Sequence, residues 1–320
     1  MMDVVALGEL LIDFTCIGSD DDGYPTMAAH PGGAPANYLA ALAKFGARTA
    51  LLGKVGDDAF GRLLVSTLRK AGVETKGVVC ADDVFTTLAF VTLDQTGNRE
   101  FSFARKPGAD TCLAFEELDL SLIDGAKVFH FGSLSLTGEP ARTATRRAVE
   151  YAKKQGKLIS YDPNLRKPLW PDLEEAREQL LWGLSQADVV KISDEEVDFL
   201  FGLAPEEGAD RIFERFGAKL VFVTCGGDGC VYKNANAKGR VAALKNITVA
   251  DTTGAGDIFG GSAMWKLLEM GKAPGSLSAG ELETIVGFAC ASAGLSATRP
   301  GGISSVPGLE DVLRCWNNME

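Results

Sequence analysis

Short apolar runs rich in Val, Leu and Phe alternate with longer segments of helical period along most of the chain. The apolar runs include VVALGELLIDF, TALLGKVG, KVFHFGSLSL, KLISYDPN, ADVVKIS and KLVFVTCG. Segments such as ANYLAALAKFG and FGRLLVSTLRKAG repeat their apolar residues at helical spacing. Strands that alternate with helices predict βαβ units, and therefore an α/β fold with a mostly parallel sheet covered on both faces.

Two regions interrupt this alternation. Between Ile17 and Pro31 the chain is polar and rich in turn residues (GSDDDGYPT). In TTLAFVTLDQTGNREFSFARK, two alternating runs flank Gln95-Thr96-Gly97-Asn98, which predicts a β-hairpin. We expect 14–31 and 84–108 to form a small β-lid within a single domain that spans 1–320.

Composition narrows the class of protein. With 320 residues, 46% of them hydrophobic, the chain can bury a large core. A net charge of −11 disfavours nucleic acid and anionic membranes as partners. The seven cysteines include no CxxC pair, which argues against a disulfide framework or a zinc knuckle and favours the reducing cytoplasm. No basic leader or apolar run of about 18 residues suggests a signal peptide or membrane span.

Polar and glycine residues follow most of the predicted strands. Open parallel sheets bind ligands at the carboxyl ends of their strands. The residues there are Asp13, Gly32, Gly33, Asn37, the segment DPNLR from Asp162, and the ranges 193–196, 224–229 and 251–257. Carboxylates and amides bind vicinal hydroxyls, and close backbone approach suits phosphates. The sequence therefore predicts a cleft for a small polyol and a phosphate donor.

The stretch DTTGAGDIFGG combines an anion-binding feature with a fixed negative charge. Gly254-Ala255-Gly256 precedes a segment with amphipathic helical spacing, and a helix N-terminus favours a phosphate. Asp257 either caps this helix or accepts the proton of a sugar hydroxyl that attacks a γ-phosphate. The residues alone leave both interpretations open.

Other chemistries find less support. The chain has no GxxxxGK[ST] loop, and in GAGDIFG Asp257 would lie against a dinucleotide pyrophosphate, which disfavours a nicotinamide oxidoreductase. Of the two histidines, His130 lies in a strand-like run and is expected to be structural, whereas His30 is left open. Nucleophilic catalysis by serine or cysteine is therefore not expected.

Two separated motifs resemble the signatures of the ribokinase-like (PfkB) carbohydrate kinases. They are PGGAPANYLAALAKFGARTALLGKVGDDAFG and DTTGAGDIFGG, and the resemblance extends in order from GELLIDF to SATRPGGISSVP. It implies a ribokinase-like three-layer α/β/α sandwich with a β-lid that often serves dimerisation. It also implies ATP-dependent phosphorylation of a hydroxymethyl group, with ATP, Mg²⁺ and K⁺ as cofactors and a homodimer formed through the lid.

The resemblance also implies roles for individual residues. Asp257 is similar to the family's general base, and the N–H groups of Gly254, Ala255 and Gly256 to its anion hole. The implied sugar ligands are Asp13, Gly32, Gly33, Asn37, Arg105 from the lid, and Arg166. The implied nucleotide contacts are Asn164, Lys191, Thr224, Gly226, Gly229, Gly254 and Gly256. The implied monovalent-cation site comprises Asp251, Thr253, Ser296, Arg299, Gly301 and Ser305.

Two positions depart from the family pattern. Ser193 to Glu196 stands where the family has Asn-x-x-Glu, so Glu196 either organises Mg²⁺, directly or through water, or completes a helix capping box. In FACASAG, many relatives have an asparagine near the position of Cys290, which leaves the adenine contacts open.

The segments DPNLRKPLW, GGAPANYLA, LGKVGDD and HFGSLSL look most like those of fructokinases. The resemblance thus implies conversion of fructose to fructose 6-phosphate. Arg105 and Arg166 can instead pair with a carboxylate, which keeps 2-keto-3-deoxygluconate open as a substrate. A different sugar kinase, such as a ribokinase, and a sugar-binding regulatory protein without catalysis are also compatible with these motifs.

Overall fold

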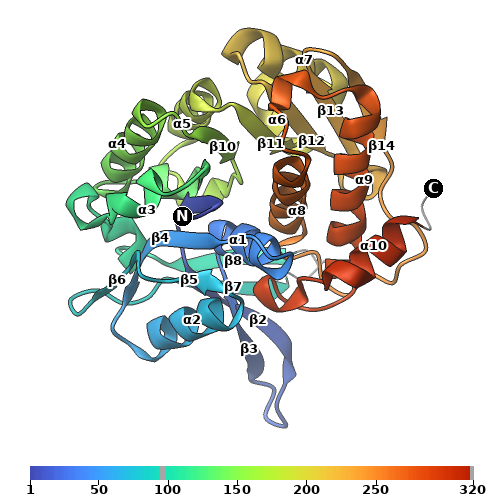
Figure 1. Cartoon of the computed structure of the whole chain (residues 1–320). Coiled ribbons are helices and arrows are strands. Elements are labelled where there is room, and N and C mark those ends of the chain that lie inside the picture. Colours follow the sequence, from blue (N-terminus) through green and yellow to red (C-terminus); the bar gives the residue numbers. More distant parts are fainter. Residues whose placement is uncertain (94–98, 318–320) are drawn as a thin grey trace.

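The computed structural model describes residues 1–93 and 99–317. Its main sheet has the strand order β14-β13-β12-β11-β10-β9-β1-β4-β5, and β6 pairs with β4 (Figure 1). Neighbouring strands run parallel except where β13 and β14 join antiparallel at one end. The strands are β1 Val4–Leu7, β4 Thr49–Gly56, β5 Val73–Glu74, β6 Val78–Ala81, β9 Val128–Gly132, β10 Leu158–Asp162, β11 Val189–Ser193, β12 Leu220–Thr224, β13 Cys230–Asn234 and β14 Lys238–Val241. The predicted mostly parallel sheet is confirmed.

Helices cover both faces of this sheet, because successive side chains of a strand point to opposite faces. Val4 and Ala6 of β1 join a core with α1, α2, α8 and α9, whereas Val5 and Leu7 join a core with α3 to α7. The helices are α1 Ala34–Lys44, α2 Ala59–Lys70, α3 Leu120–Asp124, α4 Ala141–Lys154, α5 Leu173–Gln186, α6 Asp194–Phe201, α7 Pro205–Phe216, α8 Ala255–Met270, α9 Ala279–Ser296 and α10 Leu309–Asn317. The predicted α/β/α layers are confirmed. Among the described residues, no helix has both the length and the apolar character required to cross a membrane.

Two segments outside the alternation form a second sheet, in the order β3-β2-β7-β8. Strand β2 pairs antiparallel with β3 and parallel with β7, and β7 pairs antiparallel with β8. The strands are β2 Leu11–Ser19, β3 Pro25–Gly32, β7 Leu88–Leu93 and β8 Arg99–Ala104. The predicted antiparallel pair β7–β8 is therefore confirmed, while its expected loop, Gln95-Thr96-Gly97-Asn98, lies outside the described residues.

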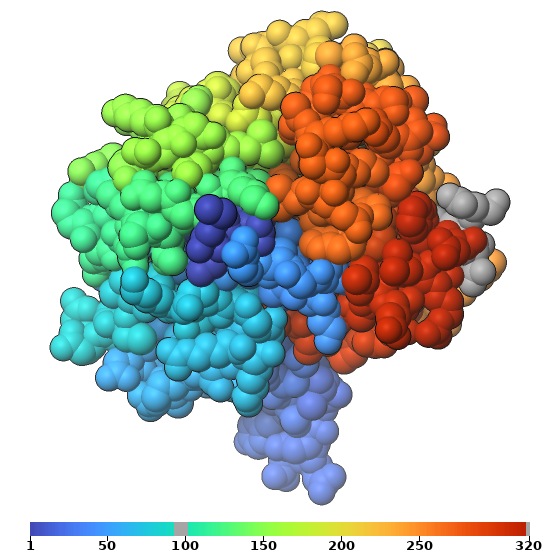
Figure 2. Space-filling view, viewed as in Figure 1, coloured from blue at the N-terminus to red at the C-terminus, as the bar shows by residue number. Residues whose placement is uncertain are grey.

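The segment between Ile17 and Pro31 is a strand hairpin, although its composition suggested a turn-rich loop. Only residues 20–24 form the turn, and the hairpin projects from the body of the molecule (Figure 2). Its outer half is exposed. A strand that buries neither face has no need of apolar alternation, so the sequence pattern gave no signal there.

The apolar run VVALGELLIDF is divided between the two sheets. Strand β1 ends at Leu7 and β2 begins at Leu11 in the second sheet. A Cβ atom on Gly8 would lie 2.5 Å from Cγ of Pro35, so the connecting turn approaches α1 closely. Asp13 therefore lies within a strand of the second sheet, and not directly after a strand of the main sheet as expected. A continuous apolar run cannot reveal where the chain changes sheet, because both parts are buried.

Helix α8 is buried on most sides, which corrects the amphipathic pattern expected for it. It packs between α1 and α9 (Figure 1), and its buried residues include Ile258, Phe259 and Met264. A Cβ on Gly261 would lie 2.4 Å from the carbonyl oxygen of Tyr38. The small residues of α8 thus permit close contact with α1 and fix the position of the N-terminus of α8.

Candidate active site

A cavity of about 260 Å³ opens where the carboxyl ends of β1, β9 and β10 meet the second sheet. Along the main sheet, β4 lies on one side of β1 and β9 to β12 lie on the other. Open α/β sheets bind ligands where the strand order reverses in this way. The volume suits a ligand smaller than a typical drug. The lining residues are Glu9, Leu11, Asp13, Thr15, Gly33, Ala34, Asn37, Val91, Phe103, Leu134, Asn164, Arg166, Thr252, Thr253, Gly254 and Asp257.

Asp257 lies in the first turn of α8 and lines this cavity. Its Oδ2 accepts a hydrogen bond from Nδ2 of Asn37 at 2.9 Å. Burial raises the pKa of the Asp257 carboxyl above its ordinary value, and the nearby ammonium of Lys191 opposes that rise. The helix is capped at Gly254 without a side-chain hydrogen bond, so the interpretation of Asp257 as the helix cap is wrong. A positioned carboxyl with a raised pKa has the properties of a general base.

Asn37 presents an acceptor that the protein leaves unsatisfied. Its side chain is buried, and its Oδ1 has no hydrogen-bond partner within the described part of the chain. Buried polar atoms normally find a partner. Because Asn37 also lines the cavity, a ligand hydroxyl is well placed to donate to this oxygen.

The N-terminus of α8 supplies the backbone expected to bind an anion. Gly254 has a φ of 75°, and a Cβ there would lie 3.0 Å from Nδ2 of Asn37. Among the three predicted donors, the N–H of Ala255 already donates to the carbonyl of Thr252 at 3.2 Å. The predicted anion hole therefore depends chiefly on Gly254 and Gly256, together with the positive end of the helix dipole.

Asp13 and Arg166 line the same cavity and determine much of its electrostatics. Burial raises the pKa of Asp13 to about 7; Arg166 opposes this rise, whereas Asp257 and Asp251 add to it. Arg166 also lowers the pKa of Asp257. Two carboxylates and one guanidinium thus influence each other across the cavity.

The second sheet forms one wall of the cavity. Leu11, Asp13 and Thr15 are alternate residues of β2, and all three line it, as expected for one face of a strand. Val91 of β7 and Phe103 of β8 add to this wall. The sheet is therefore located where a lid over a ligand would lie.

Gly32 and Gly33 join this sheet to α1. A Cβ on Gly32 would lie 2.4 Å from Oδ2 of Asp13. Gly33 has a φ of 114°, and a Cβ there would lie 2.4 Å from the carbonyl oxygen of Glu9. Gly33 excludes a side chain because the clash is with backbone, whereas a side chain at Gly32 would have to displace the carboxylate of Asp13. These glycines allow Asp13 and Glu9 to approach the start of α1.

Glu9 also lines the cavity, although the sequence-based prediction omitted it. It is 2% exposed, and its Oε1 accepts the N–H of Ala34 at 2.7 Å. Burial raises the pKa of Glu9 to about 7. The available signal was an acid two positions after the end of β1. It was missed because VVALGELLIDF was interpreted as one strand.

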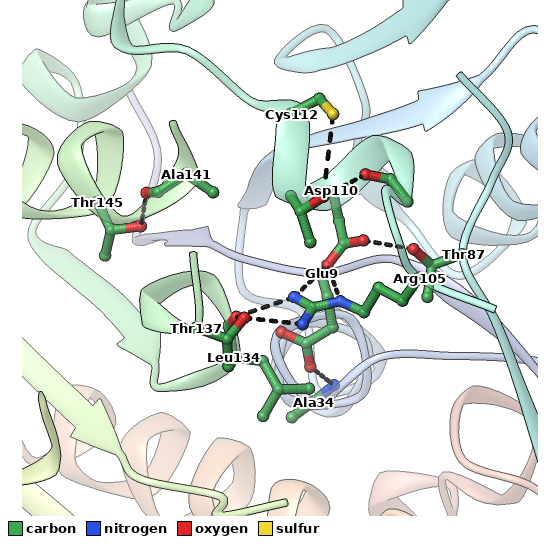
Figure 3. Close-up of polar contacts among 12 residues, drawn as sticks. Glu9, Ala34, Thr87, Arg105, Asp110, Cys112, Leu134, Thr137, Ala141 and Thr145 are labelled. Carbon is green, nitrogen blue, oxygen red and sulfur yellow. Dashed lines mark hydrogen bonds and ion pairs between the residues drawn. The ribbon is translucent and has the colours of Figure 1, made fainter. Parts of the chain in front are cut away.

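Arg105 is not among the residues that line the cavity. It follows β8, its side chain is 4% exposed, and its Nε and Nη2 donate to Oδ2 of Asp110 at 2.9 and 2.6 Å. Nη2 also donates to the carbonyl of Leu134, and Nη1 to the hydroxyl of Thr137 (Figure 3). The structure therefore buries this guanidinium behind the cavity wall, and does not bring it into the cavity as a sugar ligand.

Two of the residues predicted to contact nucleotide lie near Asp257. Asn164 lines the cavity and has a φ of 46°. The Nζ of Lys191 donates to Oδ2 of the buried Asp162 at 3.0 Å. A Cβ on Gly256 would lie 3.0 Å from that Nζ. The ammonium of Lys191 is thus held beside the N-terminus of α8.

Thr224, Gly226 and Gly229 lie outside the cavity lining, at the carboxyl end of β12. Gly226 and Gly229 have φ values of 51° and 91°. A Cβ on Gly229 would lie 2.0 Å from the carbonyl of Val241. This glycine loop therefore lies at the same edge of the sheet as the cavity, formed by the carboxyl ends of the strands, but two strands further along, past β10 and β11.

Glu196 forms the capping box. Its Oε2 accepts the N–H of Ser193 at 2.8 Å, and its Oε1 accepts the N–H of Leu165 at 2.6 Å. Both carboxylate oxygens are thus engaged by backbone, which does not fit a direct metal ligand. Within residues 1–93 and 99–317, no group of three or more His, Cys, Asp or Glu side chains is arranged to hold a metal ion.

The residues expected to bind a monovalent cation belong to two adjoining segments. Asp251 accepts the N–H and hydroxyl of Thr253 through Oδ1, and the N–H of Gly301 through Oδ2. The hydroxyls of Ser296 and Ser305 donate to the carbonyls of Ala293 and Gly302. Arg299 lines a separate groove of about 320 Å³ beside α10. Asp251, Thr253, Ser296 and Ser305 carry side-chain oxygen atoms of the kind that such a cation requires. Arg299 has no oxygen in its side chain.

His130 is structural, as expected. It is buried, stacks on Tyr38 with ring centroids 3.7 Å apart, and shares a hydrogen bond of 2.9 Å with Ser160. Burial lowers the pKa of His130 to about 3, so the ring is neutral. It therefore supports the wall between β9 and α1 and carries no charge.

Comparisons with known proteins agree with this geometry. The sequence model of the pfkB family carbohydrate kinases matches residues 1–309. Fructokinase-1 of Oryza sativa subsp. japonica is 45% identical over 97% of this chain and 96% of its own length, and Fructokinase-2 of Solanum habrochaites is 42% identical over 97% and 94%. The crystal structure of a fructokinase with bound ATP from Xylella fastidiosa superposes with a TM-score of 0.91, at 31% identity over 99% of both chains. A fructokinase from Vibrio cholerae O395, in its fructose, ADP and calcium ion bound form, gives 0.85 at 31% identity over 98% and 99%.

Proposed function

Because this chain belongs to the pfkB family of carbohydrate kinases, we propose that it is an ATP-dependent fructokinase that converts fructose to fructose 6-phosphate. One observation carries the proposal: a buried carboxyl, Asp257, lies at a helix N-terminus and faces a cavity of sugar size. The similarity to curated fructokinases, which extends over 97% of the chain, favours fructose as the sugar.

The cavity suits a neutral polyol. Asp13 and Asp257 offer carboxylate oxygens, and Asn37 offers a buried oxygen without a partner in the described chain. Hydroxyl groups of a ketose donate to these acceptors, while Arg166 donates to a hydroxyl or phosphoryl oxygen. Val91 and Phe103 of the second sheet cover the sugar and exclude water, which limits hydrolysis of ATP.

In the reaction, Asp257 accepts the proton of the 6-hydroxyl as that oxygen bonds to the γ-phosphorus. The bond from the γ-phosphorus to the β,γ-bridging oxygen breaks, and ADP leaves. The N–H groups of Gly254 and Gly256 and the N-terminus of α8 stabilise the transferring phosphoryl group, whose charge is greatest at this stage. Lys191 and Arg166 supply positive charge nearby.

We propose that the nucleotide lies along the sheet edge from Asn164 to the loop of Thr224, Gly226 and Gly229. The proposed Mg²⁺ would be held by phosphate oxygens and water, and Glu196 would act through the backbone that it positions. Thr253 and the loop of residues 296–305 would hold the proposed K⁺, which would add positive charge near the phosphates.

The charge of the cavity argues against a sugar-acid substrate. Glu9, Asp13 and Asp257 are three acids in its lining, against the single guanidinium of Arg166, and Arg105 is committed to Asp110. The test is ATP consumption with Mg²⁺ and K⁺ against fructose, ribose, 2-keto-3-deoxygluconate, adenosine and tagatose. We expect a clear preference for fructose. Preference for the sugar acid or for ribose would refute the fructokinase assignment, and silence with every substrate would favour a regulatory sugar-binding protein.

We further propose a cytoplasmic homodimer formed through the second sheet. Ile17 and Tyr24 on the projecting hairpin are 64% and 69% exposed, which suits burial against a second copy. The seven cysteines are free thiols, as a reducing compartment maintains them. Light scattering of the wild type and of Ile17→Asp tests the dimer, and an unchanged mass for the variant would contradict this interface.

A further inference from the structure

Glu9 is a buried acid at the sugar cavity to which the proposed reaction assigns no step. It follows β1, lines the cavity and touches the start of α1 through the N–H of Ala34. In Figure 3 a dashed line joins one Glu9 oxygen to Ala34, and the backbone N–H of Glu9 itself also donates to this carboxyl. A carboxylate has about four acceptor positions, so these two backbone contacts leave capacity for a donor in the cavity.

The guanidinium of Arg105 lies next to Glu9 but is bound elsewhere (Figure 3). A guanidinium has five N–H groups. Arg105 gives four hydrogen bonds, two to Asp110, one to the carbonyl of Leu134 and one to the hydroxyl of Thr137. When ionised, Glu9, Asp110 and Arg105 together carry one net negative charge. The charge of Glu9 is therefore not cancelled by its basic neighbour.

From this arrangement we propose that Glu9 is a specificity-determining residue, whose carboxylate accepts a hydrogen bond from a hydroxyl of the neutral ketose and repels substrates that carry a carboxylate. The inference rests on the proposed function and deepens it. Asp110 acts indirectly, as a positioning residue that holds Arg105 away from the substrate. A site selects one substrate against another by repulsion as well as by attraction, and a charged acceptor strengthens a hydrogen bond.

The test compares the wild type with Glu9→Gln at pH 8, where the carboxyl is ionised. Glutamine keeps the volume and the acceptor for Ala34 but removes the charge. We expect KM for fructose to rise about tenfold, with kcat changed by about twofold or less, because a hydrogen bond to a charged group is lost. The ratio of kcat/KM for fructose to that for 2-keto-3-deoxygluconate should fall about tenfold or more.

Two further variants separate this role from a structural one. Glu117→Gln is the matched control, because Glu117 also accepts a backbone N–H, that of Ala114, outside the cavity; it should leave both KM and the ratio unchanged. Glu9→Asp keeps the charge but shortens the side chain, so it should raise KM for fructose and still exclude the sugar acid. Melting temperatures establish that the variants are folded.

The outcomes distinguish this inference from the proposed function. A folded Glu9→Gln enzyme with the wild-type KM and the wild-type ratio would reduce Glu9 to a cap of α1 and overturn the inference alone. If Glu9→Gln does not fold, a Glu9→Asp enzyme that accepts the sugar acid as readily as fructose would overturn it. A wild type that prefers the sugar acid would instead remove the proposed function.

Discussion

Replacement of Asp13 by asparagine should increase stability and abolish sugar binding. Burial raises the pKa of Asp13 from 3.8 to about 7. Because a tenfold change in acidity corresponds to about 1.4 kcal/mol, the ionised side chain costs at most about 4 kcal/mol in the folded protein. Asparagine has the same shape and cannot ionise, so Asp13→Asn removes this cost. The opposition of stability and activity is common at binding sites.

The effect has a definite dependence on pH. Below pH 3.8, folded and unfolded chains both hold the proton, and the acid costs nothing. Between pH 3.8 and about 7 only the folded chain holds it, so the wild type's free energy of unfolding falls as pH rises through this window. The advantage of Asp13→Asn should therefore be about 2 kcal/mol at pH 5 and grow to at most about 4 kcal/mol at pH 8.

Urea unfolding at pH 5 and pH 8 measures this difference, and calorimetric titration with fructose measures the lost binding. Asp21→Asn, in the exposed turn between β2 and β3, is a control with the same chemistry and should leave stability unchanged at both values. If Asp13→Asn gains no more stability at pH 8 than at pH 5, burial does not raise the pKa of Asp13, and this prediction is wrong.

Three other predictions follow from the site. Asp257→Ala should lower kcat by about 10²- to 10⁴-fold, the usual contribution of general acid–base catalysis, with Kd for ATP nearly unchanged and fructose still bound, though more weakly because one acceptor is lost; residual turnover near the wild-type rate would exclude Asp257 as the base. Between pH 6 and pH 8, kcat/KM for fructose should rise, because Asp13 and Glu9 have pKa values of about 7 and the pKa of Asp257 is also raised; a flat profile would contradict this. Asp110→Ala should lower the free energy of unfolding by about 3–5 kcal/mol, because it leaves the buried Arg105 unpaired, whereas Asp57→Ala, in an exposed pair with Arg62, should cost about 1 kcal/mol or less; equal costs would show that Arg105 finds another partner.

The sequence predicted the layers because burial imposes a regular period. The central strands of the main sheet, such as β1 and β9, are buried on both faces, and Val4 and Val5 could therefore be recognised as core without knowledge of their partners. The hairpin of β2 and β3 has an exposed outer half, so no periodic pattern of apolar residues marks its strands there. Its ladder is held by backbone hydrogen bonds, which leave little trace in composition.

The residues of the candidate site could be predicted where a sequence motif contains them. They could not be predicted where their position depends on the three-dimensional path of the chain. Asp257 and Asn37 are 220 positions apart in sequence yet share a hydrogen bond, and each stands in a recognisable motif. Glu9 could not be identified, because its role depends on where β1 ends and β2 begins. The position of Arg105 depends on Asp110, and the sequence contains no rule that an arginine near a site will be held by an acid five positions later.

The same residues explain why this cavity is prepared for its substrate at a cost to the fold. Asn37 keeps a buried oxygen without a partner in the described chain, Asp13 and Glu9 bear carboxyls whose pKa burial raises to about 7, and Gly33 adopts a φ of 114°. A core of apolar residues in their place would be more stable. Under the proposed function, a bound polyol would offset these costs, because its hydroxyls would donate to the acceptors that the protein leaves open. The same acceptors would discriminate between substrates. A ligand that lacks those hydroxyls, or that carries a negative charge, leaves the acceptors without hydrogen bonds, and its binding free energy is then small.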